Sequence, residues 1–412
     1  MTDLSRRRFL QVTSAAAAAA VGPVWLRLGS AHASETAAVA GRKLVVMYLG
    51  GGNDGLNTVI PYLNSDYQRR RLTVSYRPDQ VLLLPDSLEY GLHPRLPALQ
   101  GLYTQGKAAI VHGVGYPGQD LSHFTSMDVW FSGHLDRQSS TGWLGRWLDA
   151  TPDDGRAVRA VSIGYALAPM LVGERDSGVA VPSYGGFAFA DGVDLDPMSE
   201  PFRRHEAFLQ SCTNAVVGSA ANAYQRSAIR TVGAVRAVNQ LGNTEAPAPA
   251  TFAEQMGFAI ELLNSSLGVE LAYLTPPVGF DDHAGEQTSQ PDHLGLVDEA
   301  IARFAADVSA LPDADDYLLM IFSEFGRRPE ENASAGTDHG TAAPVLLVGN
   351  AVRGGLYGEH PSLADAALDR NGNLVPTVDF RDIYAELLDR WLVGPSANEL
   401  LGYTPAASVG FL

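Results

Sequence analysis

A run of apolar residues, Leu44 to Leu49, leads directly into three glycines and a polar pair, Asn53 and Asp54. A strand that is apolar at every position has no polar face to give to water, so it must be covered on both sides. Sheets whose strands are buried on both faces are mostly parallel and carry helices on both faces. This run therefore favours an α/β fold with the strand inside a parallel sheet.

Further strands and helices alternate after this run. Apolar runs predict strands over 108–114, 269–274, 317–322 and 345–348, and apolar spacing predicts helices over 94–105, 124–131, 252–267, 294–311 and 381–392. The alternation predicts an α/β fold, with a mostly parallel sheet flanked by helices on both faces. We expect one domain over residues 34–412, with a helical insertion and a linker at about 195–250.

The charge and the cysteine content exclude several classes of partner and site. The chain has 29 basic and 46 acidic residues, for a net charge of −17. This excess of acidic groups argues against nucleic acid or an anionic membrane as the main partner. The single cysteine, Cys212, excludes an intramolecular disulfide and a cysteine-rich metal site.

The first 33 residues have the pattern of a twin-arginine export signal. Arg6 and Arg7 precede Phe9, an alanine-rich apolar stretch follows, and Ala31-His32-Ala33 matches a cleavage site. The alternative is a basic amphipathic helix or a membrane anchor. We expect a periplasmic or secreted protein, with no membrane span once the signal is removed, because no later stretch reaches the length of a spanning helix.

Polar residues follow four of the predicted strands. The clusters are Asn53-Asp54, Asp120 to His123, Asp281 to His283, and Ser323 to Arg327 followed by Asp338-His339. Open parallel sheets bind ligands beyond the carboxyl ends of their strands. Carboxylates mixed with imidazoles suit zinc, manganese or a similar ion. The sequence thus predicts one or two divalent metal ions, held by Asp54, Asp281, His283, Glu324 and His339, with Asp338 as a further candidate ligand.

Each cluster also has a purely structural interpretation. Asp54 follows three glycines, as a turn residue does, and Glu324 is close to Arg327, with which it could form an ion pair. Ser122 precedes a predicted helix and suits an N-cap, although the same position would let the helix N-terminus stabilise an oxyanion. His123 is either a residue that supports a ligand or a packed histidine.

A glycine pattern in the first cluster matches the dinucleotide fingerprint G-x-G-x-x-G through Gly50, Gly52 and Gly55. The fingerprint should open a helix and be followed by an acidic residue after a second strand. Here Pro61 follows soon after, and the expected acid is missing. Nicotinamide binding is therefore disfavoured.

The order of the clusters resembles the alkaline phosphatase and sulfatase superfamily. There, a first strand ends in a metal-binding Asp, matched here by Asp54, and the next strand leads to a nucleophile at a helix start, matched by Ser122. An Asp and a His that bind one metal are matched by Asp281 and His283, and a last His is matched by His339. The resemblance implies an alkaline-phosphatase-like fold.

Within that superfamily the motifs are most similar to those of an uncharacterised family of exported bacterial proteins, classed as a domain of unknown function. The motifs are Gly51 to Thr58, Ser122-His123-Phe124, Phe280 to Ala284, Ser323 to Arg327 and Gly336 to Gly340. The resemblance extends from Arg42 to Leu392.

Two positions depart from the superfamily pattern. Phe325 stands where the enzymes keep a metal-binding His, and Glu324 where they keep Asp. One metal position is then lost, or Asp338 replaces a ligand. Cys212 is followed by Thr213 and Asn214, not by the Pro-x-Arg pattern, which excludes a formylglycine sulfatase.

The resemblance leads to one main hypothesis, an exported metal-dependent hydrolase of phosphate or sulfate esters. Ser122 would attack the phosphorus or sulfur, and Arg327 would bind a non-reacting oxygen. The expected partner is a small anionic ester. Two alternatives stay open: a non-catalytic exported protein with an eroded site, which binds or assembles with an exported partner, and an exported oxidoreductase.

Overall fold

The computed structural model describes residues 41–152, 156, 158–183, 198–213, 220–241, 248–405 and 407–412. The expected export signal, residues 1–33, lies outside the described residues, as do residues 242–247 of the expected linker. Among the residues that are described, no helix combines the length and the apolar content that crossing a membrane requires.

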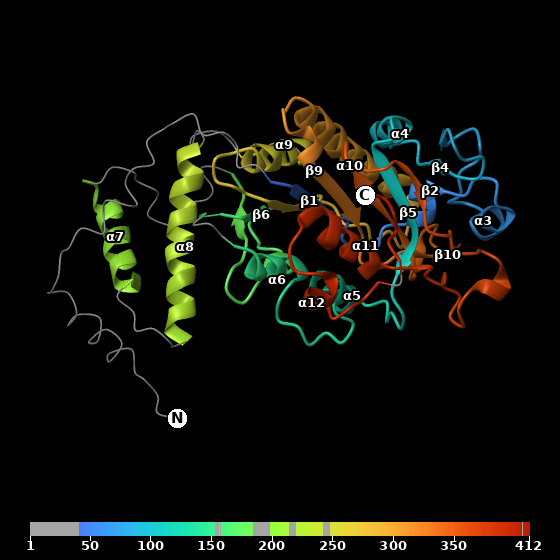
Figure 1. The fold of residues 1–412 in the computed structure, drawn as a ribbon. Helices are drawn as coiled ribbons and strands as arrows, with labels where there is room; N and C mark the ends of the chain where they lie inside the picture. The colour runs from blue at the N-terminus through green and yellow to red at the C-terminus, as the bar shows by residue number, and fades with distance from the viewer. Residues whose placement is uncertain are drawn as a thin grey trace.

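A sheet of nine strands forms the centre of the described structure (Figure 1). In spatial order the strands are β13 (Gly355–Tyr357), β5 (Ala108–Gly115), β12 (Ala343–Val348), β9 (Tyr317–Phe322), β1 (Lys43–Tyr48), β8 (Leu271–Leu274), β6 (Ala160–Ile163) and β7 (Val179–Val181), and β14 (Val378–Asp379) pairs with β5. All pairings are parallel except those of β12, which is antiparallel to both of its neighbours. The prediction of a mostly parallel sheet is confirmed.

Both faces of this sheet are covered by helices, as predicted. Alternate residues of β1 point to opposite faces, so Val45 and Met47 enter one core while Leu44 and Val46 enter the other. The first core includes residues of α4 (Pro97–Thr104), α9 (Phe252–Leu263) and α10 (Glu286–Ser309), and the second includes residues of α5 (His123–Ser132), α6 (Trp143–Ala150), α11 (Phe380–Glu386) and α12 (Ala397–Leu401). Figure 1 shows the two groups of helices on opposite sides of the strands.

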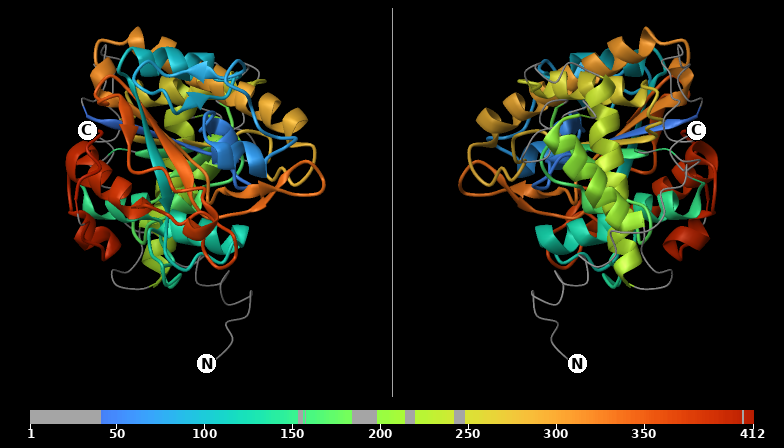
Figure 2. Two further views of the ribbon diagram at one scale, coloured as in Figure 1. Left: turned by 90° about the vertical axis from the view of Figure 1, so that its right-hand side faces the viewer. Right: turned by 90° about the vertical axis from the view of Figure 1, so that its left-hand side faces the viewer.

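Two helices lie in the range where the insertion was expected, α7 (Glu200–Thr213) and α8 (Ala220–Leu241). They run side by side at one end of the molecule, at the front of the right-hand view in Figure 2. The Arg236 guanidinium of α8 lies 4.5 Å from the centre of the Phe202 ring of α7. Val238 of α8 packs into the first core, so α8 is attached to the sheet and not separate from it.

Helix α10 begins at Glu286, well before the predicted start at Leu294. Its first turns carry Glu286 and Gln290, which are polar and fully buried. These side chains bond to other buried polar groups, so the first turns show no apolar spacing from which a helix could be predicted.

Smaller elements connect the layers. They are α2 (Gly55–Thr58), α3 (Ser65–Arg70), a sheet of β2 (Val59–Ile60), β4 (Gly91–Leu92) and β3 (Leu82–Leu83), the hairpin of β10 (Arg327–Glu331) and β11 (Thr337–His339), three 3-10 turns (Pro169–Leu171, Ala314–Asp316 and Asp365–Ala367) and a π-helical turn (Leu387–Leu392). The β10–β11 hairpin matters most for function, because it follows β9 and brings Arg327, Asp338 and His339 to the carboxyl edge of the sheet.

Candidate metal centre

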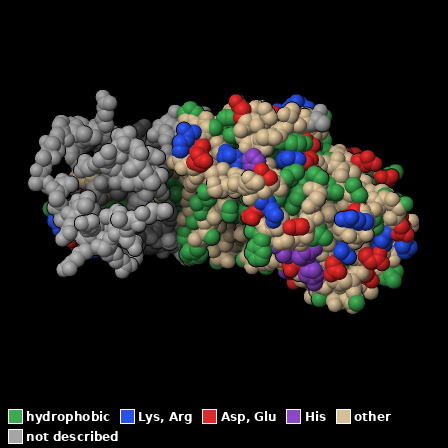
Figure 3. All heavy atoms as spheres, turned by 90° about the horizontal axis from the view of Figure 1, so that it is seen from below, with side chains coloured by type: hydrophobic (Ala, Val, Ile, Leu, Met, Phe, Trp, Pro, Cys, Tyr) green, Lys and Arg blue, Asp and Glu red, His purple; other side chains and the backbone are tan. Residues whose placement is uncertain are grey.

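The loops that follow β1, β5, β8 and β9 meet at one edge of the sheet, because these strands run in the same direction. The loop after β8 is tied to the end of β1 by a hydrogen bond of 2.8 Å from the Phe280 amide to the Gly50 carbonyl. Figure 3 shows histidine side chains gathered at the surface beside acidic ones. The polar clusters that end these strands therefore share one region, as expected for an open parallel sheet.

Two glycines allow this close approach. Gly51 and Gly52 have φ angles of +115° and +73°, a region that favours glycine. A Cβ at Gly51 would lie 2.6 Å from the Asp281 amide nitrogen, and one at Gly52 would lie 2.2 Å from the Phe325 ring. The end of β1 therefore contributes backbone, and no side chain, to the space beneath Asp281.

Asp281 is the carboxylate at the centre of the site. Its Oδ1 lies 3.0 Å from Nε2 of His283 and 3.0 Å from Nε2 of His339, and its Oδ2 lies 3.6 Å from Nε2 of His123. Arg327 donates a hydrogen bond of 2.6 Å to Oδ1. Burial opposes ionisation of Asp281, but the hydrogen bond and the charge of Arg327 favour the ionised carboxylate, and the pKa of Asp281 is lowered to about 2.

Each of the three histidines is oriented by an acceptor at its other ring nitrogen. Nδ1 of His339 lies 2.8 Å from the Leu121 carbonyl, and a carbonyl can only accept, so Nδ1 carries the proton. Nδ1 of His123 lies 2.7 Å from Glu324, and Nδ1 of His283 lies 3.3 Å from Asp338. In each neutral ring the single N–H is thus used at Nδ1, and the Nε2 lone pair faces Asp281.

This arrangement brings acceptors together with no donor between the rings. Nε2 of His283 and Nε2 of His339 lie 3.0 Å apart, and both lie beside the same carboxylate oxygen. Lone pairs at that separation repel one another unless a cation lies among them. Two ligands of one tetrahedral zinc ion are separated by about 3.3 Å, from bond lengths of about 2.0–2.1 Å. The donor set and its spacing therefore fit a divalent transition-metal ion.

The cluster is partly open to solvent. The side chains of Asp281 and His283 are 46% and 44% exposed, whereas the side chain of His339 is only 23% exposed. Within the described residues, the ligand atoms of His123, Asp281 and His339 lie within 4.8 Å of one another, close enough to share one ion. A metal held here would keep an accessible side, as catalytic sites do and closed structural sites do not.

Glu324 and Asp338 lie behind the rings and not at the centre. Glu324 is fully buried and accepts hydrogen bonds from His123, from the Gly51 amide and from the Ser323 hydroxyl. Burial opposes its ionisation, but the His123 hydrogen bond and the backbone amides lower its pKa. Bonds from Asn332 and then His283 likewise lower the pKa of Asp338. In the structure these two carboxylates contact the Nδ1 atoms of His123 and His283, and their assignment as direct metal ligands stays a prediction.

Asp54 lies apart from the cluster in a buried network. Both of its carboxylate oxygens pair with the Arg71 guanidinium, and Oδ1 also caps α2 by accepting from the Leu56 and Asn57 amides. Its side chain is 2% exposed. Burial opposes ionisation, but Arg71 outweighs it and lowers the pKa of Asp54. The structure thus pairs Asp54 with Arg71 and does not bring it to the histidine cluster; its assignment as a metal ligand stays a prediction.

Arg327 is also built into the backbone framework. Its side chain is fully buried, and it donates to the carbonyl oxygens of Gly51, Gly52, Phe280 and Thr337 as well as to Asp281. These bonds use all three of its nitrogens. Arg327 therefore ties together the loops that carry the centre, and its contact with a substrate oxygen stays a prediction.

Ser122 stands at the N-cap of α5, next to two residues that belong to the centre. The carbonyl of Leu121 receives the His339 bond, and His123 faces Asp281. The backbone amide of Ser122 donates to Asp120, while its hydroxyl makes no capping bond within the described part of α5. The Ser122 hydroxyl is therefore not used to cap the helix.

His123 was not predicted as a metal ligand from the sequence, but the structure brings it to the cluster around Asp281. Its ring lies 4.9 Å from the ring of Phe325 and 4.4 Å from that of His339, centre to centre. Phe325 stands at the position where the superfamily pattern has a histidine, and the His123 ring from another loop packs against it. The motif Ser122-His123-Phe124 was the available signal.

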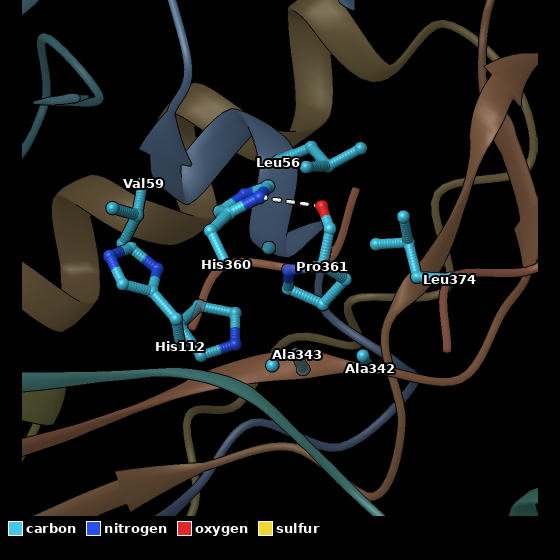
Figure 4. A pocket seen from close by; sticks show the side chains of 11 residues that line it. Leu56, Val59, His112, Ala342, Ala343, His360, Pro361 and Leu374 are labelled. Atoms are coloured by element: carbon cyan, nitrogen blue, oxygen red, sulfur yellow. Dashed lines mark hydrogen bonds between the residues drawn. The ribbon is translucent and has the colours of Figure 1, made fainter. Parts of the chain in front are cut away.

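A second pair of histidines lies away from the centre and lines a small cavity (Figure 4). His112 and His360 border a space of about 20 Å³ together with Val59, Leu56 and Pro361. A space of that size admits about one water molecule. Burial lowers the pKa of His112 to about 3. Burial lowers the pKa of His360 as well, and no function was assigned to either histidine from the sequence.

Comparison with protein families identifies the chain. The model of a family described as "Protein of unknown function (DUF1501)" matches residues 104–397, which is well over half of the sequence. The chain belongs to the DUF1501 family. This confirms the family resemblance seen in the motifs. A comparison with curated proteins found no match for this DUF1501 protein.

Three of the solved structures that are similar to this DUF1501 protein are described here. A protein in the alkaline phosphatase superfamily from Vibrio parahaemolyticus is 11% identical, with 79% of this chain and 64% of that chain covered and a TM-score of 0.31. The C-terminal periplasmic domain of EcEptC from Escherichia coli, in complex with Zn, is 10% identical. The match covers 76% of this chain and 74% of that chain, with a TM-score of 0.35. The alkaline phosphatase of the Antarctic bacterium TAB5 is 11% identical. The match covers 75% of this chain and 91% of that chain, with a TM-score of 0.34. All three TM-scores are below 0.5. The description of the fold therefore rests on the strand order of this chain and not on these matches.

Proposed function

We propose that this protein is an exported metal-dependent hydrolase of an anionic ester, either a phosphate or a sulfate, and that Ser122 is its nucleophile. One observation carries the proposal. Three imidazole Nε2 atoms face the carboxylate of Asp281, and each ring is held in that orientation by an acceptor at Nδ1. Such backing of histidine ligands is typical of metal sites.

The residues that would hold the ion are His123, Asp281, His283 and His339. A bound divalent cation supplies Lewis-acid polarisation of the ester oxygen and lowers the pKa of a nearby hydroxyl. The chain itself supplies the orientation. Arg327 holds the Asp281 carboxylate, while Glu324 and Asp338 hold two of the rings.

Two features of the chain near Ser122 support its proposed role as the nucleophile. It lies at the start of α5, where the free backbone amides of the first turn attract an anionic oxygen. The bond from His339 to the Leu121 carbonyl fixes the peptide that leads into Ser122. The start of α5 is therefore tied to the centre through His339.

Turnover of chromogenic phosphate and sulfate esters tests the proposal. We expect activity that EDTA removes and Zn²⁺ or Mn²⁺ restores, and a loss of at least about 10³-fold in kcat for Ser122→Ala. Thr125→Ala removes another hydroxyl from the first turn of α5 and should keep most of the activity. A protein that binds metal but turns over no ester would contradict the hydrolase and favour the alternative binding role.

A further inference from the structure

We infer that the centre holds a single divalent cation per chain, and that Arg327 and Arg71 neutralise the carboxylates that a second cation would need. This inference rests on the proposed function, because it concerns the same centre. The sequence left one or two ions open. The distribution of charged groups around Asp281 and Asp54 decides between these alternatives.

The carboxylate after the first strand already has a cation. Asp54 and Arg71 are both buried, and the guanidinium contacts both carboxylate oxygens. Two amide groups of α2 add to the shell around Oδ1. A metal ion at Asp54 would have to displace a buried guanidinium, which would then lack its counter-ion.

The second guanidinium lies beside the centre itself. Arg327 reaches Asp281 Oδ1 at 2.6 Å from the side opposite to solvent, and its remaining bonds go to backbone carbonyls that cannot move away independently. Its positive charge therefore occupies the inner side of Asp281. Two-metal sites place their ions about 3.5–4 Å apart with carboxylates between them. Here the inner position is filled by a permanent cation.

The remaining carboxylates are already engaged. Glu324 is buried and bound by His123, Gly51 and Ser323, and Asp338 Oδ1 accepts bonds from Asn332 and His283. Among the described residues, the ligand atoms of His123, Asp281 and His339 lie within 4.8 Å of one another. Nε2 of His283 lies 3.0 Å from Asp281 Oδ1 and 3.0 Å from His339 Nε2, so the two groups share Asp281 and His339. We assign all four side chains to one ion, because four ligands are the complement of one zinc ion.

Elemental analysis and native mass spectrometry of the zinc-loaded full mature chain test this inference. We expect one zinc per chain in the wild type and in Asp54→Asn, and less than 0.1 zinc per chain in Asp281→Asn. Two zinc ions in the wild type, falling to one in Asp54→Asn, would overturn the single-ion inference and leave the hydrolase standing. No bound zinc in the wild type would overturn the inference and the proposed function together.

A second measurement keeps the test valid if Asp54→Asn does not fold. Calorimetric titration of the metal-free wild-type protein with Zn²⁺ should show one equivalence point at one ion per chain. A second equivalence point at two ions per chain would overturn the inference without the use of any variant.

Discussion

His339 donates a hydrogen bond of 2.8 Å from Nδ1 to the carbonyl oxygen of Leu121, the residue that precedes Ser122. Leu121 has a φ of 60°, which is uncommon for any residue with a side chain. Such conformations cost about 1–3 kcal/mol and persist where the surrounding structure holds them, often at functional sites. One bond thus fixes both the orientation of the His339 ring and the peptide that leads into Ser122.

Zinc should stabilise the fold through this histidine. At a concentration 100-fold above its dissociation constant, a ligand that binds only the folded state adds about 2.7 kcal/mol to the free energy of unfolding. We expect this gain in the wild type and its loss in His339→Asn, measured by thermal unfolding with and without Zn²⁺. His134→Asn changes a histidine outside the centre and should keep the gain. An equal gain in His339→Asn would show that zinc binds elsewhere.

Glu324 should tune the affinity for metal without binding it. Glu324→Gln removes the charge that faces His123 Nδ1 but keeps the size of the side chain. Loss of such a supporting partner weakens metal binding by about 10–100-fold. Competition with a zinc-binding dye measures the change. Glu261→Gln, an exposed change on α9, serves as the control. An unchanged affinity in Glu324→Gln would mean that this carboxylate does not support a ligand.

Two buried acids that lie side by side, Glu286 and Asp54, should lose very different amounts of stability on amide substitution. Burial, and then the charge of Asp54, raises the pKa of Glu286 well above its ordinary value, whereas Arg71 lowers that of Asp54, so we expect Glu286 to be the neutral partner of the pair. Glu286→Gln should cost about 1 kcal/mol or less in urea unfolding at neutral pH. Asp54→Asn leaves Arg71 buried without its charged partner and should cost about 3–5 kcal/mol. Equal costs would contradict this assignment of charge.

His93 should make the fold sensitive to acid. Burial lowers its pKa to about 3, and its ring bonds to Tyr76 and to the Arg95 amide. The unfolded chain takes up a proton near pH 6.5 and the folded chain does not, so stability falls as the pH falls between these two values. At pH 5 the loss is about 2 kcal/mol relative to neutral pH.

The variant His93→Asn isolates this contribution, because an amide oxygen can replace Nδ1 as the acceptor of the Arg95 amide. Its drop in unfolding free energy from neutral pH to pH 5 should be smaller than that of the wild type by about 2 kcal/mol. Urea unfolding at the two pH values gives both drops. If the drops were identical, His93 would not be the group that takes up the proton.

The export prediction has its own test. Arg6→Lys combined with Arg7→Lys removes the paired arginines that a twin-arginine signal requires. We expect the double variant to stay in the cytoplasm, as measured by fractionation and immunoblotting, while a Lys43→Arg variant is exported normally. Normal export of the double variant would contradict a twin-arginine route.

The main strands could be predicted because their sequences are apolar throughout. Leu44 to Leu49 gave β1 within a residue at each end, and the run over 317–322 matches β9. The first turns of α10 could not be predicted, because Glu286 and Gln290 face buried polar groups and leave no apolar spacing. Apolar periodicity reports burial among hydrophobic residues and fails where the buried surface is polar.

The candidate site was partly visible in the sequence for a similar reason. Asp281, His283 and His339 follow strands, so the parallel sheet itself brings them to one edge. Asp54 also follows a strand, but nothing in the sequence indicates that Arg71 would fold back and pair with it. The place of His123 depends on Glu324, a partner 201 residues away, which local pattern does not reveal.

Anomalous diffraction at the zinc edge, from crystals of the mature protein grown with Zn²⁺, tests the metal centre most directly. We predict one peak per chain, within bonding distance of Asp281 and of the Nε2 atoms of His283 and His339. The absence of a peak at Asp281, or a peak coordinated by Asp54, would contradict the account.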